Sequence, residues 1–398
     1  YIGGGMANSS GSPHLSDVTF SGNTARDGGG MHSELSNPIL SGVIFSGNSA
    51  SEDGGGMYSD LGSNPVLINV TLSGNSAGED GGGMCNIFWS SLDLFNRILW
   101  NNQDSSGTAT ISATIYNDNT SFITLTHSLI QGTGGSASWT SNSSFVDGGN
   151  NLDSDPDFIQ DVDPSSAPTA AGNLRLQADS PAIDRGNNVF SSGLSTDLDG
   201  KPRVVDGDLD GTATVDMGAY EFQIYALVVT LAGSGSGMVT GNGISCSSSD
   251  PGSDCTAIFP EDTILTLTAS ADYGSTFTGW SGACNHADAV CTVAMVAARS
   301  VTATFTLNQY PLSVSLAGTG GGSVSSTPPG INCGVDCTEN YDYGSLVSLT
   351  AVADSGSTFS GWGGACTGTG DCEVTMTEAL SVTATFARLD LYIPLIFR

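Results

Sequence analysis

The sequence predicts an all-β protein, in which a parallel β-helix (a β-solenoid) is followed by two small disulfide-bonded β repeat domains. Three observations predict this class. Glycine, serine and threonine are abundant in the 398 residues and only 12% of residues are charged, a composition that favours strands and turns over helices. A short motif recurs in the first half of the chain. A longer motif with four cysteines occurs twice after residue 245.

The short motif joins an apolar-SGN stretch to three glycines and a methionine. It reads FSGNTARDGGGM at 20–31, FSGNSASEDGGGM at 45–57 and LSGNSAGEDGGGM at 72–84, a period of 25 to 27 residues. A unit this short cannot bury its apolar face alone, so successive units must stack as coils. We expect the methionines to stack inward and the asparagines of each SGN to form a hydrogen-bonded ladder. These residues are Met6, Met31, Met57, Met84, Asn23, Asn48 and Asn75.

Apolar slots repeat between the motifs and define the core of each predicted coil. Three units align without gaps at a leucine, a valine and a third apolar residue, and the last of these units has Leu67, Val70 and Leu72 in these slots. A fourth, degenerate copy is expected to place Phe95, Ile98 and Trp100 in the same slots, and a fifth is expected in ITLTHSLIQG. Because like residues would stack coil upon coil, the pattern predicts one continuous apolar core.

The repeats at 1–160 resemble the polymorphic-membrane-protein type of repeat, whose signature pairs GGG plus an apolar residue with FSGN. That resemblance implies a right-handed parallel β-helix in a bacterial surface or secreted protein. The next segment, 161–222, contains SPAIDRGN and DMGAYEF. It resembles the region that closes bacterial β-helix proteins of the choice-of-anchor class. This second resemblance implies an acidic continuation and cap of the solenoid.

The acidic segment also contains a candidate calcium site. In DGDLDG, the carboxylates of Asp206, Asp208 and Asp210 alternate before a glycine, and hard oxygen ligands at this spacing can wrap Ca²⁺. Asp216 is the nearest substitute for the bidentate glutamate that an EF-hand would require, and Asp197 and Asp199 offer further oxygens. The alternative is a solvated turn with Asx hydrogen bonds. Ca²⁺ is the one cofactor that we expect.

The second repeat carries eight of the nine cysteines. The gap between paired cysteines changes from eight and six residues in the first copy to three and five in the second. Zinc sites hold tight spacings, so this drift favours disulfides, which in turn favour an oxidising, extracellular compartment. Local pairs are favoured, although sequence cannot exclude cross-pairing within each copy. They are Cys246–Cys255, Cys284–Cys291, Cys333–Cys337 and Cys366–Cys372.

The two copies, at 225–306 and 310–387, resemble divergent InlB-type B-repeats of bacterial surface proteins. GWSGAC in the first copy, GWGGAC in the second and SVTATF in both carry the resemblance, which implies a stalk, spacer or binding module without catalysis. Alternating stretches such as TILTLTAS predict half-buried strands. Trp280 and Trp362 occupy equivalent places and are expected to anchor the two cores, with carbohydrate stacking as the alternative.

The chain begins within a coil, at YIGGGM, and ends with an apolar tail at 388–398. An uncapped solenoid end leaves backbone groups and apolar side chains unpaired. Either upstream coils are missing or a neighbouring subunit covers this end. The tail resembles short endings of secreted Chloroflexi proteins. It could form a last strand of its own domain, a sorting or anchoring signal, or a strand added to a neighbour. The candidate assembly residues are Tyr1, Ile2, Leu391, Tyr392, Ile393, Leu395, Ile396 and Phe397.

The function that the sequence favours is a non-enzymatic structural role outside the cell. A net charge of −31 argues against binding nucleic acid or anionic membranes. No apolar stretch is long enough to span a bilayer, and a secretory signal is expected to have been removed or to lie outside this sequence. No catalytic set stands out. We predict a self-assembling filament or matrix subunit with head-to-tail contacts. The alternatives are a glycan-binding adhesin or stalk and, third, a polysaccharide lyase or hydrolase.

Overall fold

The computed structural model describes residues 1–139 and 144–389. It confirms the predicted fold class, because the chain is almost entirely β and begins with a β-solenoid of parallel strands. The chain divides into two compact units, Tyr1–Ile224 and Tyr225–Arg398, which we call unit 1 and unit 2. Among the described residues, no helix has the length and apolarity needed to cross a membrane.

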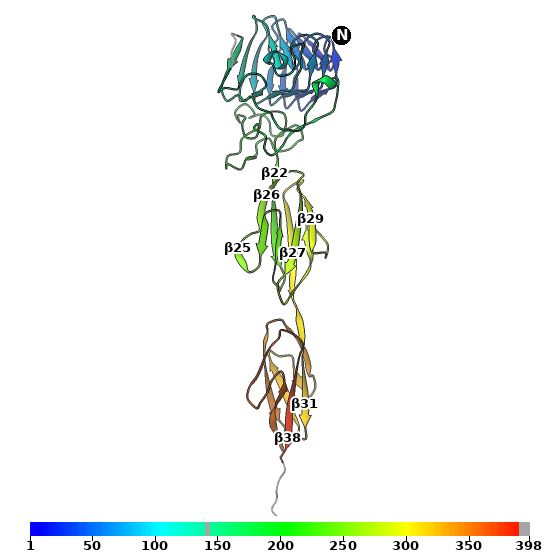
Figure 1. Cartoon of the computed structure of the whole chain (residues 1–398), viewed down its shortest axis with the longest axis vertical. Helices are drawn as coiled ribbons and strands as arrows, with labels where there is room; N and C mark the ends of the chain where they lie inside the picture. Colours follow the sequence, from blue (N-terminus) through cyan, green and yellow to red (C-terminus); the bar gives the residue numbers. More distant parts are fainter. Residues whose placement is uncertain (140–143, 390–398) are drawn as a thin grey trace, which may run out of the picture. The chain divides into compact units, whose positions relative to one another are not determined.

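Unit 1 is built from parallel sheets in which each strand pairs with its equivalent in the next coil (Figure 1). The first sheet contains β1 (Met6–Ser9), β5 (Met31–Glu34), β9 (Met57–Asp60), β13 (Met84–Asn86) and β16 (Ile115–Asn117). The second contains β2 (His14–Ser16), β6 (Ile39–Ser41), β10 (Val66–Ile68), β14 (Ser91–Phe95), β17 (Phe122–Thr126) and β19 (Phe145–Asp147). The third contains β3 (Thr19–Ser21), β7 (Ile44–Ser46), β11 (Thr71–Ser73), β15 (Ile98–Trp100) and β18 (Leu129–Ile130).

Shorter elements complete unit 1. A small parallel sheet contains β4 (Thr24–Ala25), β8 (Ser49–Ala50) and β12 (Ser76–Ala77). One helical turn, α1 (Ile111–Thr114), precedes β16, and its N-cap Thr110 accepts a hydrogen bond from the backbone of Ala113. The segment after the coils holds an antiparallel pair, β20 (Phe158–Gln160) and β21 (Asn173–Leu176), and a 3₁₀ turn at Pro164–Ser166.

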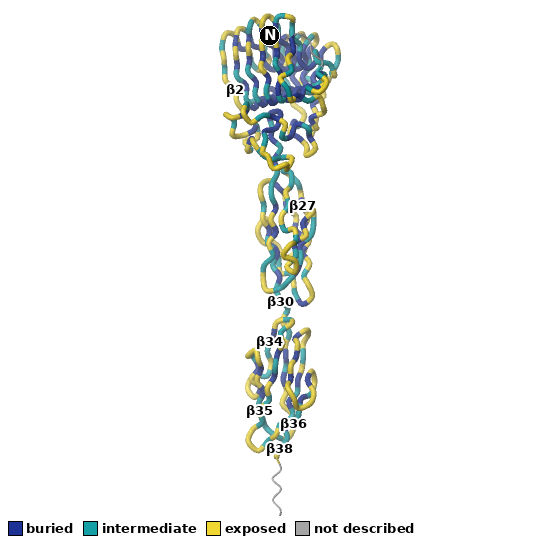
Figure 2. Tube along the Cα trace, turned by 90° about the vertical axis from the view of Figure 1, so that its left-hand side faces the viewer, coloured by how far each residue is buried: buried dark blue, intermediate teal, exposed yellow. Residues whose placement is uncertain are grey.

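The core of unit 1 follows the predicted stacks. Met31, Met57 and Met84 are fully buried, and Met31 pairs in register with Met57 and Met57 with Met84. Figure 2 shows buried residues along the inside of the coils and exposed residues at their turns. The asparagine ladder is also present, because the side-chain oxygen of Asn75 accepts from both the backbone and the side-chain nitrogen of Asn48. Each asparagine of the ladder therefore satisfies buried polar groups of the preceding coil.

The fourth coil differs from the prediction by one residue. Leu67 pairs with Leu94 rather than Phe95, and Leu72 pairs with Leu99 rather than Trp100. This copy is apolar at neighbouring positions, so its sequence does not fix which set faces inward, and a shift of one residue exchanges the two faces. Consequently Arg97, instead of Ile98, follows Val70 in the valine slot and is fully buried.

Close backbone approach explains the glycine runs and gives a first prediction. A Cβ on Gly55 would lie against the carbonyl oxygens of Ser76 and Gly82. Gly55→Ala is therefore expected to destabilise unit 1 by about 1–3 kcal/mol, as overpacking does, measured by calorimetric unfolding of the full chain. Gly193→Ala, at a site with no heavy atom within 4 Å of the added Cβ, should leave the transition unchanged. Equal effects of the two substitutions would contradict this explanation.

The outward face of the first sheet carries carboxylates in register and gives a pH prediction. Glu34 pairs with Asp60, and burial, together with the charges of Glu34 and Asp27, raises the pKa of Asp60 to about 6. The folded state then binds a proton more tightly than the unfolded state, so this contribution to stability is present at low pH and lost as pH rises through about 6. We expect Asp60→Asn to reduce the fall in Tm of unit 1 between pH 5 and pH 7. An unchanged slope would contradict the assignment.

Unit 2 contains two repeat domains, each made of two sheets (Figure 1). The first has β26 (Thr256–Pro260), β22 (Ile224–Ala232), β30 (Arg299–Leu307) and β28 (Ser275–Gly282) opposite β25 (Asp250–Asp254), β24 (Ile244–Ser247), β23 (Gly237–Gly241), β27 (Ile264–Ala271) and β29 (Val290–Ala294). The second has β34 (Thr338–Asp342), β31 (Gln309–Gly318), β38 (Leu380–Arg388) and β36 (Ser357–Gly364) opposite β33 (Asn332–Cys333), β32 (Gly322–Thr327), β35 (Leu346–Ala353) and β37 (Cys372–Thr375).

In both repeat domains the first and last strands lie side by side and run parallel, as the pairs β22–β30 and β31–β38. Each core is apolar and includes cysteines. The disulfides join neighbours in the sequence: Cys246–Cys255, Cys284–Cys291, Cys333–Cys337 and Cys366–Cys372. Cys85, in unit 1, is free and buried, and burial raises the pKa of its thiol, so it is not an activated nucleophile.

Candidate ligand-binding site

A buried ionic cluster organises the acidic segment of unit 1. The Arg203 guanidinium is almost fully buried and donates to the backbone oxygens of Ala219, Asp216 and Gly218. Its Nε lies 3.8 Å from Oε2 of Glu221. The Glu221 carboxylate also accepts from the backbone nitrogens of Val205, at 3.1 Å, and Asp216, at 3.0 Å. These contacts hold residues 216–222, the DMGAYEF segment, around the Arg203 side chain.

Asp216 connects this cluster to the SPAIDRGN segment. Its carboxylate accepts from the backbone nitrogens of Asp184, at 2.8 Å, and Phe222, at 2.6 Å. Burial raises the pKa of Asp216 to about 7 and that of Glu221 to about 9. Both carboxyl groups are therefore part of the buried cluster around Arg203. Through Asp216 and Asp184, the DMGAYEF and SPAIDRGN segments, which carry the choice-of-anchor resemblance, contact one another.

The predicted calcium ligands are only partly brought together. One carboxylate oxygen each from Asp206, Asp208 and Asp184 lies within 4.8 Å of the others. Asp210 accepts a hydrogen bond from the backbone of Thr212 and is not part of this group of three. Asp216 lies in the buried cluster around Arg203. Asp184 was not predicted as a ligand. It belongs to SPAIDRGN, and the fold places it beside Asp206 and Asp208 of the DGDLDG loop.

The cluster of Asp184, Asp206 and Asp208 could hold a hard cation such as Ca²⁺, which prefers carboxylate oxygens. Asp184 already accepts from the backbone nitrogens of Asp208 and Thr214, so it is fixed in place. The Oδ1 atom of Asp206 is buried and has no hydrogen-bond partner among the described residues. Asp197 and Asp199, which were also predicted as calcium ligands, make other contacts. The Asp199 carboxylate pairs with exposed Arg175, and the Asp197 carboxylate accepts a hydrogen bond from the backbone nitrogen of Glu221.

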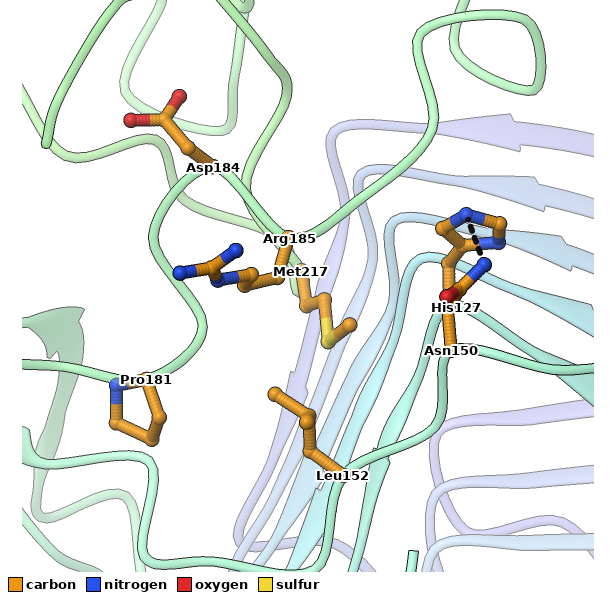
Figure 3. Close-up of a pocket in the computed structure, with 7 residues that line it drawn as sticks. All are labelled: His127, Asn150, Leu152, Pro181, Asp184, Arg185 and Met217. Carbon is orange, nitrogen blue, oxygen red and sulfur yellow. Dashed lines mark hydrogen bonds between the residues drawn. The ribbon is translucent and has the colours of Figure 1, made fainter. Parts of the chain in front are cut away.

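A cleft of about 560 Å³ lies between the later coils and the acidic segment. Figure 3 shows its walls: Leu152 and Met217 point toward one another, with His127 and Asn150 on one side and Arg185 on the other. Pro181 and Asp184 complete the lining. The volume is typical of sites for small organic ligands, which combine an apolar surface with a few polar groups.

The polar side of the cleft is built on a strained turn. His127 has a positive φ of 47°, and its Nε2 lies 3.0 Å from Nδ2 of Asn150. Since an amide nitrogen donates, Nε2 is the acceptor and the proton is on Nδ1. Burial lowers the pKa of His127, so the ring is neutral at pH 7. Its Nδ1 atom has no partner among the described residues. The half-buried His127 ring therefore positions Asn150, and the cleft offers the Asn150 amide and the Arg185 guanidinium beside its apolar surface.

The tryptophans of the repeat domains face their cores. Trp280 and Trp362 are 4% and 8% exposed, and their indole nitrogens donate to the backbone oxygens of Asp288 and Gly370. Each also packs edge-on against a phenylalanine of its domain. This arrangement fits the expected anchoring role and leaves little ring surface for stacking on a carbohydrate.

Only two of the eight candidate assembly residues belong to the described part of the chain. Tyr1 and Ile2 are exposed. The other six, Leu391, Tyr392, Ile393, Leu395, Ile396 and Phe397, lie outside the described residues.

Comparison with known proteins identifies the repeats. The divergent InlB B-repeat domain family matches residues 227–309 and 312–390, which confirms that resemblance over less than half of the chain. The polymorphic-membrane-protein and choice-of-anchor resemblances stay predictions. No curated protein sequence matches the chain. The B-repeats and disulfides are consistent with an extracellular surface protein.

Solved structures with partial similarity include a Bacillus anthracis TIE protein, at 10% identity and a TM-score of 0.28 over 44% of this chain and 36% of that one. They also include the major pilin T-13 of Streptococcus pyogenes, at 10% identity and 0.22 over 42% and 97%. A third is the minor pilin GBS52 of Streptococcus agalactiae, at 8% identity and 0.16 over 44% and 99%. This chain thus spans about a third of the Bacillus protein. At these TM-scores the similarities support no functional conclusion.

Proposed function

We propose that the chain is a non-enzymatic, glycan-binding surface protein of a bacterium. In this proposal unit 1 binds the ligand and the B-repeats of unit 2 act as a disulfide-locked spacer. The observation that carries it is the cleft, where half-buried Leu152 and Pro181 offer an apolar surface for a sugar ring. The exposed side chains of Asn150 and Arg185 offer hydrogen bonds to its hydroxyl groups. This combination of an apolar body and convergent polar groups suits a saccharide.

The lining of the cleft favours binding over catalysis. Asp184 is the only carboxylate among its seven lining residues, whereas glycoside hydrolysis needs a pair that flanks the scissile bond. The Asp184 oxygens already accept from the backbone of Asp208 and Thr214. His127 has a lowered pKa because of burial alone, without a neighbouring carboxylate that would orient it as a base. These contacts support a positioning role for both groups.

A glycan array followed by calorimetric titration tests the proposal. We expect saccharide binding by the full chain, at least tenfold weaker in Asn150→Ala and in Arg185→Ala. Arg175→Ala is the matched control, because this arginine lies outside the cleft lining and pairs with Asp199. Binding that survives both cleft substitutions would overturn the assignment of the site. Release of new reducing or unsaturated ends from a bound polysaccharide would overturn the non-enzymatic role.

We further propose that Asp184, Asp206 and Asp208 bind Ca²⁺ and so hold the acidic segment against the coils. The expected result is a rise in the Tm of unit 1 with Ca²⁺ concentration, as for any ligand of the folded state, and its reversal by a chelator. Asp206→Asn should abolish the rise and Asp210→Asn should leave it intact, because Asp210 lies outside the group of three. A Ca²⁺ effect lost in Asp210→Asn but kept in Asp206→Asn would contradict this ligand set.

Self-assembly through Tyr1, Ile2 and the apolar tail stays a prediction of the sequence. Electron microscopy of the native extracellular material tests it. Regular filaments that are lost when 389–398 are deleted would support the predicted filament subunit. Filaments of normal length from the deletion variant would exclude a role for the tail, and dispersed particles from the intact chain would favour the adhesin.

A further inference from the structure

Four large apolar side chains form an exposed ridge on the turns that follow β5, β9 and β13. They are Leu35, Leu61, Phe88 and Trp89, which are 59%, 44%, 51% and 73% exposed. The turns stack in successive coils, as the hydrogen bond from Gly62 N to Phe88 O shows. We call this set the apolar ridge. It shares no residue with the lining of the cleft.

The backbone conformation of the ridge is unusual for these residue types. All four residues have positive φ, at 51°, 51°, 53° and 70° in chain order. This left-handed region favours glycine, asparagine and aspartate, and it is strained for bulky side chains. Because the side chains are exposed, burial within the coils does not compensate the strain. The equivalent residue of the first coil, Ser10, also has a positive φ, of 59°, so the turn imposes this conformation. What needs an explanation is the use of large exposed apolar residues at this position in three successive coils.

Carboxylates accompany the ridge. Glu34 and Asp60 immediately precede Leu35 and Leu61 and lie in register with one another. The carboxylate of Asp118 accepts from the backbone nitrogen of Phe88 at 2.8 Å. No lysine or arginine occurs anywhere in residues 27–96. The ridge is therefore an apolar surface in an acidic environment.

We propose that the apolar ridge is a docking surface for a cationic polypeptide, with Trp89 and Phe88 as its anchors. Aromatic side chains carry much of the binding energy in protein interfaces, and the carboxylates beside the ridge complement a basic partner. A second copy of this chain does not fit, because each copy has 40 acidic and only 9 basic residues. The partner is therefore another protein whose contact segment combines lysine or arginine with apolar residues.

Fluorescence titration with two synthetic peptides of equal length and charge tests the proposal. One peptide is an amphipathic sequence of leucine and lysine, and the other has lysines at the same positions with serine in place of leucine. We expect the leucine-containing peptide to bind at least tenfold more tightly and to shift the tryptophan emission, because Trp89 is the most exposed tryptophan in the described part of the chain. Added salt should weaken binding.

Asparagine variants provide the control for folding. Phe88→Asn with Trp89→Asn keeps residues that tolerate left-handed backbone, so the unfolding transition of unit 1 should not fall. Peptide affinity should fall at least tenfold, measured for the original protein and the variants by calorimetric titration, which does not depend on Trp89. Leu209→Asn is the matched control, since Leu209 is 54% exposed with a φ of 60° outside the ridge. The proposal is overturned if both peptides bind equally, if the double variant keeps full affinity, or if Leu209→Asn loses as much affinity as the double variant.

Discussion

Arg203→Met is expected to destabilise unit 1 by about 3–5 kcal/mol, the usual effect of removing one member of a buried ionic group. The guanidinium is 1% exposed and donates to three backbone oxygens, of Asp216, Gly218 and Ala219. Its removal would leave those three buried oxygens without their donor, beside the buried Glu221 carboxyl group. Differential scanning calorimetry of the full chain would measure the loss, and the transitions of the repeat domains serve as an internal reference.

Arg175→Met provides the control for charge. Arg175 also pairs with an aspartate, Asp199, but the two side chains are 44% and 25% exposed. Exposed pairs contribute about 0–1 kcal/mol, so this variant should shift the transition much less. If the two variants had equal effects, the buried cluster would not be the element that holds the acidic segment together.

Arg97→Met is expected to have the opposite sign and to stabilise unit 1 by about 1–4 kcal/mol, as replacement of buried ionic groups by apolar ones can do. Arg97 is fully buried in the slot where the preceding coil has Val70. It makes one hydrogen bond, of 3.2 Å, to the backbone oxygen of Asp93, and its Nε and Nη1 have no partner among the described residues. Burial lowers its pKa well below the ordinary value.

Methionine suits this test because it is long, flexible and apolar and can fill the volume that the arginine occupies. The same calorimetric scan would show a higher Tm for unit 1 and unchanged transitions for unit 2. A lower Tm would show that the guanidinium stabilises the coil through interactions beyond its bond to Asp93, which would contradict the expected sign. Comparison with Arg203→Met then separates a buried arginine that makes three hydrogen bonds to backbone oxygens from one that makes a single such bond.

Sequence periodicity was sufficient to predict the coils wherever a slot had one apolar candidate or intact flanking motifs fixed the alignment. Met31 falls in its predicted stack because its neighbours are Gly30 and His32. Leu40 and Phe45 have isoleucines beside them, but the SGN and GGGM motifs on either side align these coils without gaps and so select the residue that faces inward. The fourth coil was misplaced by one residue because Leu94 and Phe95 are both apolar. Pattern alone cannot choose between such neighbours, and the contacts made with the adjacent coil decide the register.

The candidate sites were less accessible from the sequence. Asp206 and Asp208 were found because alternating acidic residues form a local pattern. Asp184 and the cleft residue Asn150 were not found, because the other residues of their sites lie far away in the sequence and only the fold brings them together. The apolar ridge was also missed. Its signal was local, namely leucine, phenylalanine and tryptophan at turn positions where glycine or asparagine is expected.

The parallel first and last strands of each repeat domain have a mechanical consequence. If the two ends of the first domain were pulled apart, β22 and β30 would be forced to slide past one another, and the ladder between Leu227–Ala232 and Arg299–Thr304 would be loaded in shear. All of its hydrogen bonds would then resist together instead of opening one after another. The same geometry joins β31 to β38. None of the four disulfides links these strand pairs, since each closes a loop of four to nine residues. Resistance to tension therefore resides in the backbone ladder and would persist under reducing conditions for as long as the domains stay folded.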